Sequence, residues 1–393
     1  MKFLFWLNIG FDRGGPSVHL LQDVIRHALR DGHAVKLILK DTGGSMDKVP
    51  LEFVEYEKFS YTLVPNVVTK KTNFFHRYIA EILYARKCKR AFKNNKYDVV
   101  FLQSCNAAAF YVKSLRCLKC PIVFNVQDIF PQNLLFSSQL PMEKISYPIL
   151  NALQKYAYGR VAKIITISDD MKDTLVDQGV DEDKIEVVYN WSYEDSEILL
   201  EKISEKNIFN LNMDPDKINV VYAGNIGKMQ NVEIIARAAR LSKNDESIHY
   251  YIIGDGANKI RVSEIVDGLH NVTVLPMQPA IYAESIYAQA DINVIPLAKG
   301  GIKTALPSKT ATIMRTDTKI VFCIEPHSKF GQIVNMDRRV RIADNDNPRS
   351  LYSVICDLRD ENVADAKRKR GILPLFSKKN CERYVEIMKS ARG

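Results

Sequence analysis

Two lysines in the second half of the chain stand close behind apolar runs that end in small residues. Lys228 lies in AGNIGKMQN, and Lys309 lies in LPSKTATIM, where Ser308 is a candidate cap for a helix that starts at Lys309. Glycine lets a backbone approach a ligand closely, while a lysine and the free N–H groups at a helix start attract anions. This combination is typical of a diphosphate site, although each feature alone also suits an ordinary turn or a solvated side chain.

Two further loops carry residues suited to ligand binding. Gly254, Asp255 and Gly256 end the run IHYYIIG, where a carboxylate suits a ribose or a base better than a phosphate. Gly14 and Gly15 precede the first helical stretch of the chain in a similar way. Because ligands of open parallel sheets bind at the carboxyl ends of the strands, these loops are expected to meet at such an edge.

Asp128 ends the run PIVFNVQ in the first half of the chain. A carboxylate at a strand end could orient the hydroxyl group of an acceptor. The same residue, placed before Ile-Phe-Pro, could instead cap a turn. Both interpretations remain open from the residues alone.

The elements that position these loops alternate along almost the whole chain. Short apolar runs rich in β-branched residues read as strands, with amphipathic stretches between them. They form two series: FLFWLN, AVKLILK, DVVFLQ, PIVFNVQD, KIITIS and IEVVYN, then INVVYAGN, IHYYIIGDG, VTVLP, INVIPL, KIVFCI and VRIAD. Near-continuous apolar strands joined by helices predict an α/β fold with parallel sheets covered on both faces.

A length of 393 residues favours two domains, since domains usually have about 100–200 residues each. A polar, charged stretch at 192–217 separates the two series. We therefore predict an N-terminal Rossmann-like domain at 1–191, a linker at 192–217 and a second Rossmann-like domain at 218–372. The tail at 373–393 reads as a helix that could cross back to brace the first domain.

The formal net charge of +9 predicts an anionic partner, such as a membrane surface or a phosphorylated substrate. No nucleic-acid recognition motif is present, so nucleic acid is not expected. The apolar start lacks a cleavage site, and no run reaches the roughly 20 residues of a membrane span. Seven irregularly spaced cysteines, with one Cys117–Cys120 pair, favour reduced thiols over a zinc site. We expect a cytoplasmic protein.

The motifs AGNIGK, IGDG and LPSKTATIM, in that order, resemble the donor domain of family-four retaining glycosyltransferases of the GT-B type. In the first half, RGGPSVHLL, VQDIFPQN and VVYNW are similar to segments of the acceptor domain. The resemblance implies two Rossmann-like domains facing each other across a cleft. It also implies transfer from a nucleotide-sugar, by default UDP-linked, to a polyprenyl-linked saccharide in capsule, exopolysaccharide or O-antigen synthesis.

Carried over residue by residue, the resemblance assigns roles within the predicted site. Asp128, Lys228 and Lys309 are the candidate catalytic residues, with the two lysines offsetting the charge of the leaving diphosphate. The candidate donor-binding residues are Gly14, Gly15, Asn225, Gly227, Lys228, Gly254, Asp255, Gly256, Met277, Ser308 and Lys309. No cofactor and no metal are expected, because no DxD triplet follows a strand of the donor domain in the way that a metal-dependent transferase would place it. The triplet at 344–346 follows a late strand and reads as a turn.

One departure from the family pattern keeps another function open. Thr304 and Thr312 stand where many members have a pair of glutamates. A catalytically inactive partner that binds sugar nucleotides would tolerate that loss. An NAD-dependent oxidoreductase also uses Rossmann units, but GNIGKMQN and GDGANK both lack the third glycine of its fingerprint.

Residues 58–96 alternate basic and bulky apolar side chains. Such a pattern can seat a segment on an anionic bilayer, and Lys70, Lys71, Phe74 and Phe75 are the residues we expect at that surface. An ordinary amphipathic helix, with its basic side solvated, is the alternative. It accounts at least as well for the part after Tyr78.

Overall fold

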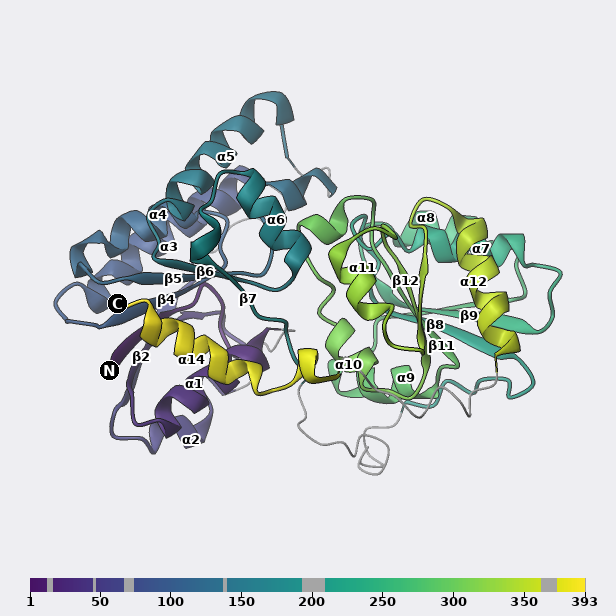
Figure 1. The fold of residues 1–393 in the computed structure, drawn as a ribbon, viewed down its shortest axis with the longest axis horizontal. Helices are drawn as coiled ribbons and strands as arrows, with labels where there is room; N and C mark the ends of the chain where they lie inside the picture. Colours follow the sequence, from purple (N-terminus) through teal and green to yellow (C-terminus); the bar gives the residue numbers. More distant parts are fainter. Residues whose placement is uncertain are drawn as a thin grey trace. The chain divides into compact units, whose positions relative to one another are not determined.

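The structure is a computed structural model of the chain, and it describes residues 1–12, 17–44, 47–66, 74–136, 140–192, 209–361 and 373–392. The chain forms two compact units (Figure 1). The first unit contains Met1–Asn190 together with Lys378–Gly393, and the second contains Trp191–Ser377. The last helix of the chain therefore belongs to the same unit as the first strand.

The first unit is built on a sheet of seven parallel strands in the order β3-β2-β1-β4-β5-β6-β7. Every residue of the strands β4 and β5 is buried, as expected for apolar runs with helices on both faces. The strands are β1 (Lys2–Trp6), β2 (Ala34–Asp41), β3 (Phe59–Pro65), β4 (Val99–Gln103), β5 (Ile122–Val126), β6 (Lys163–Thr166) and β7 (Ile185–Val187).

The helices of this unit cover the two faces of the sheet. The helices α1, α2 and α14 lie on one side, whereas α3, α4, α5 and α6 lie on the other (Figure 1). Their bounds are α1 (Val18–Arg30), α2 (Leu51–Val54), α3 (Phe74–Phe92), α4 (Ala108–Leu115), α5 (Glu143–Tyr158), α6 (Asp169–Asp177) and α14 (Asn380–Ser390), with short 3-10 turns at Arg116–Leu118, Gln132–Phe136 and Glu182–Lys184.

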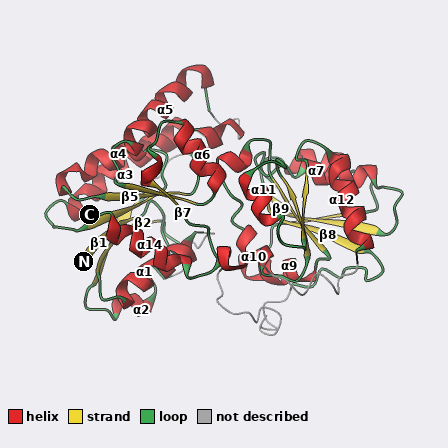
Figure 2. Cartoon of the chain, in the orientation of Figure 1, coloured by secondary structure: helices red, strands yellow, loops and turns green. Residues whose placement is uncertain are grey.

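The second unit has a sheet of six parallel strands in the order β10-β9-β8-β11-β12-β13 (Figure 2). The strands are β8 (Ile218–Asn225), β9 (Ile248–Asp255), β10 (Val272–Leu275), β11 (Ile292–Pro296), β12 (Lys319–Cys323) and β13 (Val340–Ala343). The helices are α7 (Glu233–Leu241), α8 (Lys259–Val266), α9 (Ala283–Gln289), α10 (Thr310–Met314), α11 (Lys329–Val334) and α12 (Pro348–Asp360), with 3-10 turns at Ala280–Tyr282, Gly301–Lys303 and Leu373–Phe376. Two parallel-sheet Rossmann-like units confirm the predicted α/β fold.

The stretch at 192–217 is only partly described, since residues 193–208 lie outside the described ranges. Its later part packs on α9 of the second unit. The N–H of Phe209 donates to the Ser285 hydroxyl at 3.1 Å, and the N–H of Leu211 donates to Gln289 Oε1 at 3.1 Å. The residues from 209 onward therefore form part of the second unit.

In each sheet the strand order reverses beside the first strand. The strand β1 lies between β2 and β4, and β8 lies between β9 and β11. The loops that leave the two strands on either side of such a reversal diverge, and the crevice between them is where open parallel sheets bind ligands. The fold thus marks one edge in each unit as a place for a site.

Candidate functional site

The reversal in the second unit brings Lys309 to the carboxyl end of β8. The Lys309 ammonium donates a hydrogen bond of 2.9 Å to the carbonyl oxygen of Ala223, and its Nζ lies 3.6 Å from the ring centroid of Tyr222. The Tyr287 hydroxyl donates to the same carbonyl oxygen at 3.2 Å. A cation is therefore fixed at the point where the loops after β8 and β11 diverge.

Desolvation lowers the pKa of Lys309 to about 7, because protein groups replace much of the water around its ammonium. The π face of Tyr222 partly compensates for that lost hydration. An anion bound nearby would favour the charged form of the lysine. Binding of an anion beside Lys309 would therefore be coupled to uptake of a proton.

The glycines at this edge are explained first by packing. Gly224 and Gly254 are paired in register on the strands β8 and β9. A Cβ atom on Gly254 would lie 1.9 Å from the carbonyl oxygen of Gly224, and one on Gly256 would lie 2.5 Å from that of Ile226. Side chains at these two positions would force the strand ends apart, so close contact between the two loops requires glycine.

Gly227 differs from these glycines because polar side chains surround it. A Cβ atom there would meet Gln230 Oε1 at 2.5 Å and Asn225 Nδ2 at 2.8 Å. These two amides are hydrogen-bonded to each other at 3.0 Å, and Asn225 is exposed. Lys228 follows directly and is also exposed. The loop after β8 therefore offers amide groups and a solvated ammonium beside the buried glycine contact.

Asp255 and Met277 lie at the ends of neighbouring strands in the same sheet. Asp255 is paired with Asn225 in register, and its Oδ1 accepts a hydrogen bond of 2.8 Å from the N–H of Gly256. Met277 follows β10 and is exposed. Both residues lie on the β9–β10 side of the reversal, whereas Lys309 comes from the β11 side.

The sequence predicts that Ser308 caps the following helix, and this prediction is wrong. The N-cap residue of α10 is Lys309, no side chain forms a cap bond there, and Ser308 is exposed. The helix has only five residues, so the summed dipole that a longer helix would offer an anion is small. At this loop the charge of Lys309 matters more than the helix start.

The threonines that replace the expected glutamates do not supply an equivalent group. Thr304 is buried, and its hydroxyl donates to the carbonyl oxygen of Gly301 in its own loop at 3.1 Å. A carboxylate that the sequence reasoning missed, Glu325, follows β12. Its Oε1 accepts a hydrogen bond from the Gly300 N–H, and its Oε2 is buried without a hydrogen bond in the described part of the chain. Glu325 directly follows the strand-like run KIVFCI, and this position at a strand end could have identified it as a candidate site residue from the sequence.

In the first unit, Asp128 follows β5 and its side chain is exposed. The loop after it is held by aromatic packing, since the Phe130 ring stacks on Tyr78 and Phe74 with centroid separations of 6.3 and 6.4 Å. Phe130 and Ile129 are buried. The carboxylate therefore stands at the end of an anchored loop, which suits a group that orients another molecule.

A network of neutral polar side chains connects three strand ends with the last helix of the chain. Asn125 donates to Gln103 Oε1 at 2.8 Å, and the Tyr384 hydroxyl of α14 donates to Asn125 Oδ1 at 3.3 Å. Gln127, next to Asp128, accepts a hydrogen bond of 2.8 Å from Asn190. These contacts link the ends of β4 and β5 to segments far away in the sequence.

Asp12 follows the first strand and is fully buried. Its carboxylate accepts hydrogen bonds from the Thr42 hydroxyl, the Gly44 N–H and the Lys48 ammonium. These bonds hold the pKa of Asp12 well below its usual range, although burial alone would raise that pKa. Gly14 and Gly15 lie outside the described residues, and Asp12 is the last described residue before them.

The predicted membrane residues require one correction. Lys70 and Lys71 lie outside the described ranges. Phe74 is only 5% exposed and packs with Phe130, Leu140 and Leu150, so it is a core residue and cannot enter a lipid surface. Phe75 remains 37% exposed. The sequence pattern predicts both phenylalanines at the surface, but Phe130, from the loop after Asp128, packs against Phe74.

Within the described ranges, no group of His, Cys, Asp or Glu side chains is arranged to hold a metal ion. The triplet at 344–346 forms a turn, in which Asp344 Oδ1 accepts from the Asp346 N–H at 3.0 Å and Asp346 pairs with Lys299 at 2.7 Å. In the same described part, no helix is long and apolar enough to cross a membrane.

Comparison with known proteins agrees with this geometry. Residues 13–191 match the family model for Glycosyltransferase Family 4, and residues 217–360 match the model for Glycosyl transferases group 1. The two matched segments include nearly all of both units. The chain belongs to the family-four glycosyltransferases, and the resemblance stated from its motifs is confirmed.

Individual relatives and structures point the same way. The chain is 23% identical to a protein named as the glycosyltransferase WbjE of Pseudomonas aeruginosa over 322 residues, which cover 80% of this chain and 78% of WbjE. It is 23% identical over 218 residues to one named as the colanic acid biosynthesis glycosyl transferase WcaI of Escherichia coli K12, covering 54% of this chain and 52% of WcaI. HepE of Anabaena, solved with UDP and glucose, has a similar fold, with a TM-score of 0.67, 13% identity and coverage of 99% and 100% of the two chains.

Proposed function

We propose that the protein is a retaining, metal-independent glycosyltransferase that moves a hexosyl or N-acetylhexosaminyl group from a UDP-sugar to a polyprenyl-linked saccharide. The site is proposed to work at the cytoplasmic face of the plasma membrane during synthesis of a bacterial surface polysaccharide such as a capsule. The observation that carries the proposal is the Lys309 ammonium held on Ala223 at the strand reversal of the second unit.

The second unit supplies the features that a nucleoside diphosphate requires. Glycines keep the ends of β8 and β9 in close contact, and Lys228 and Lys309 supply positive charge. Asp255, exposed at the end of β9, is proposed to bind the ribose or the base. The complex of HepE with UDP and glucose supports a UDP-linked donor by analogy.

In the proposed reaction the bond between the anomeric carbon and the diphosphate oxygen breaks, and UDP leaves with the electron pair. The acceptor hydroxyl oxygen bonds to the same carbon, and its proton passes to an oxygen of the leaving diphosphate. Lys309 and Lys228 stabilise the charge that develops on that diphosphate, which is the role of preorganised cations in group transfer. Asp128 orients the acceptor hydroxyl and does not need to remove its proton.

The name of WcaI places that relative in colanic acid biosynthesis, and colanic acid is a polysaccharide. We extend that kind of pathway to this chain as part of the proposal. A polyprenyl-linked acceptor is held in a bilayer, so the enzyme would work as a peripheral protein on that surface. The formal net charge of +9 fits an anionic bilayer of this kind.

The test is a panel of UDP-, GDP-, ADP- and dTDP-sugars incubated with the full chain, with release of the nucleoside diphosphate as the readout. We expect slow hydrolysis of one or a few UDP-sugars without any acceptor and without added metal, and no change after addition of a chelator. A second arm adds a polyprenyl-linked saccharide and follows the anomeric configuration of the product. Retention of that configuration is expected.

Two results would contradict the proposal in different ways. Tight binding of a UDP-sugar with neither hydrolysis nor transfer would assign the chain to the inactive binding partners, which the absence of the paired glutamates would then explain. Nicotinamide oxidation or reduction, with no nucleotide-sugar turnover, would assign it to the oxidoreductases.

A further inference from the structure

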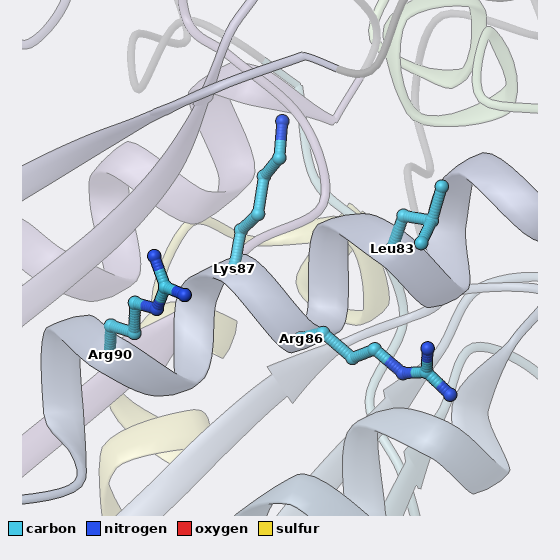
Figure 3. A pocket seen from close by; sticks show the side chains of 4 residues that line it. All are labelled: Leu83, Arg86, Lys87 and Arg90. Atoms are coloured by element: carbon cyan, nitrogen blue, oxygen red, sulfur yellow. The ribbon is translucent and has the colours of Figure 1, made fainter.

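The outer side of the helix α3 carries a hollow bordered by Leu83, Arg86, Lys87 and Arg90 (Figure 3). All four side chains are exposed, and a spacing of three and four residues places Leu83 beside Arg86 and Lys87, with Arg90 one turn further along the helix. None of the three cations forms an ion pair with any described residue. The hollow is therefore a concentration of positive charge that no ion pair within the described residues neutralises.

The only acidic residue of α3 does not offset this charge. Glu81 turns toward α4, where its Oε2 accepts a hydrogen bond of 3.2 Å from the N–H of Ala107. Burial raises the pKa of Glu81 above its usual value. The solvent side of α3 thus carries cations and aliphatic side chains, with Ile79 exposed about two turns and Leu83 about one turn before Arg86.

The helix α5 exposes an apolar stripe of its own. Met142, Ile145 and Ile149 are 57–68% exposed, and their spacing of three and four residues places them on one side of the helix. Lys144 and Lys155, also on this helix, are exposed as well. Aliphatic side chains that protrude between lysines are typical of a helix that lies in a membrane interface, and they offer nucleic-acid bases no stacking platform.

The stripes on α3 and α5 point away from the same face of the sheet. The strands β4, β5 and β6 are neighbours in the sheet, so right-handed crossovers place α4 and α5 on the same face. The crossover from β3 to β4 runs across the sheet in the same direction and places α3 on that face as well. The helix α4 packs against both α3 and α5. Figure 1 shows these helices on the side opposite α1 and α14. We call this the α3–α5 outer surface: Leu83, Arg86, Lys87 and Arg90 on α3 with Ile145 and Ile149 on α5.

We propose that the α3–α5 outer surface seats the first unit on an anionic phospholipid bilayer, with Arg86, Lys87 and Arg90 against phosphate headgroups and Ile145 and Ile149 at the acyl-chain boundary. The proposal rests on the proposed function, in which the acceptor is held in a membrane. The α3–α5 outer surface takes the place of Phe74 as the expected membrane contact, because Phe74 is buried in the core.

The test uses the full chain and two kinds of vesicle, phosphatidylcholine alone and phosphatidylcholine mixed with phosphatidylglycerol. The wild-type protein should bind only the mixed vesicles, and less strongly as salt is added. Replacing Arg86, Lys87 and Arg90 by Ser should lower the partition coefficient about a hundredfold, because each basic residue near such a surface contributes about fivefold. Ile145→Ser with Ile149→Ser should weaken binding while leaving its dependence on anionic lipid.

The matched control removes three cations from the opposite face. Arg30 on α1 and Arg383 and Lys389 on α14 are exposed, and their replacement by Ser changes the net charge by the same amount. This control should bind as the wild type does. Equal loss in both triple variants would show that only the overall charge matters, and it would overturn the proposal.

Two further readouts separate the possible failures. Hydrolysis of the UDP-sugar in the absence of lipid should be the same in all variants, because none of the replaced residues belongs to the proposed donor site of the second unit. Unchanged hydrolysis with no vesicle binding would overturn the membrane seat and leave the proposed function standing. Binding of inorganic phosphate at α3 without binding of vesicles would assign the hollow to a soluble anion, which also overturns it.

Discussion

The two sheet edges of this protein carry their candidate chemistry in different ways. In the second unit the edge is built mainly from backbone, with Gly224 and Gly254 in contact and Lys309 bonded to a main-chain carbonyl. In the first unit it is built from side chains, among them the network that joins Asn125 to Tyr384 and the cluster around Asp12. A backbone-built edge suits a ligand part common to many donors, while a side-chain-built edge can be varied to suit one acceptor.

The largest effect is expected from Lys309→Ala. Loss of one preorganised cation at the leaving group should lower kcat by on the order of a hundredfold. Lys228→Ala should also reduce turnover, but less, because Lys228 is exposed and its charge is screened by solvent. The rate of UDP-sugar hydrolysis measures both. Wild-type rates in two folded variants would show that the backbone alone stabilises the diphosphate.

A second test concerns the side-chain edge. Asp128→Asn should reduce transfer to the acceptor by roughly tenfold or more, a modest share of what positioned acid–base groups contribute, while the affinity for the donor stays unchanged. Calorimetry with the nucleotide-sugar and a transfer assay on the same preparation provide the two numbers. Lost nucleotide-sugar binding would move Asp128 from the acceptor to the donor.

The fold was predictable from the sequence because strands of a covered parallel sheet are apolar throughout. FLFWLN and PIVFNVQD could be recognised without any tertiary information. The position of Gly254 at a strand end followed from the same pattern, because it closes the run IHYYIIG, and Gly254 lies near the end of β9. Lys309 comes from the longer loop between β11 and α10. Their roles in binding remain predictions.

The parts that could not be predicted depend on contacts between distant segments. Phe74 stands next to Phe75 and close to Lys70 and Lys71, a pattern that suggests a surface position. Its burial depends on packing against Phe130, which is distant in the sequence. Tyr222 looked like any strand aromatic, although its ring faces the Lys309 ammonium. Ser308 had the composition of a cap, but the helix begins one residue later and is short.

A third test concerns the backbone-built edge directly. Gly254→Ala would place a methyl group 1.9 Å from the Gly224 carbonyl oxygen, and such overpacking usually costs about 1–3 kcal/mol. We expect a lower Tm together with a several-fold loss of UDP affinity. The control is Gly268→Ala, where the φ of +73° strains an alanine but no atom lies within 4 Å. This control should lower the Tm and leave UDP affinity unchanged.

A fourth test uses pH. The pKa of Lys309 is about 7 in the free protein, below its ordinary 10.5, and a bound diphosphate should raise it. UDP affinity should therefore fall as the pH rises above about 7, by up to tenfold per pH unit. Calorimetry at pH 8 in buffers with different ionisation enthalpies should detect uptake of close to one proton. Lys309→Met should abolish that uptake.

The sign for stability follows from the same shift. The pKa of Lys309 is lower in the folded protein than in the unfolded chain, so a protonated Lys309 destabilises the folded state. This free-energy cost is present in full below pH 7, where the lysine is protonated in both the folded and the unfolded state. The cost is relieved as the pH rises from about 7 toward 10.5, where the folded protein keeps a neutral lysine that the unfolded chain would protonate. The contribution of Lys309 to the free energy of unfolding should therefore rise over that range. If Lys309→Met removed none of this rise, the desolvation of Lys309 would be contradicted.

The smallest effect is expected from Tyr384→Phe, which tests whether the last helix tunes the side-chain edge. The Tyr384 hydroxyl lies 3.3 Å from Asn125 Oδ1 and 3.5 Å from Gln127 Nε2, so both hydrogen bonds are long. Removing the hydroxyl should cost about 1 kcal/mol of stability. Because Gln127 precedes Asp128, we also expect a change of about twofold in the KM for the acceptor, with kcat for donor hydrolysis unchanged. Met388→Leu on the same helix is the control, since it perturbs a buried apolar residue of α14. An equal shift of the acceptor KM in both variants would reduce α14 to a brace for the sheet. A shift in Tyr384→Phe alone would show that a residue from the end of the chain helps to shape the acceptor edge.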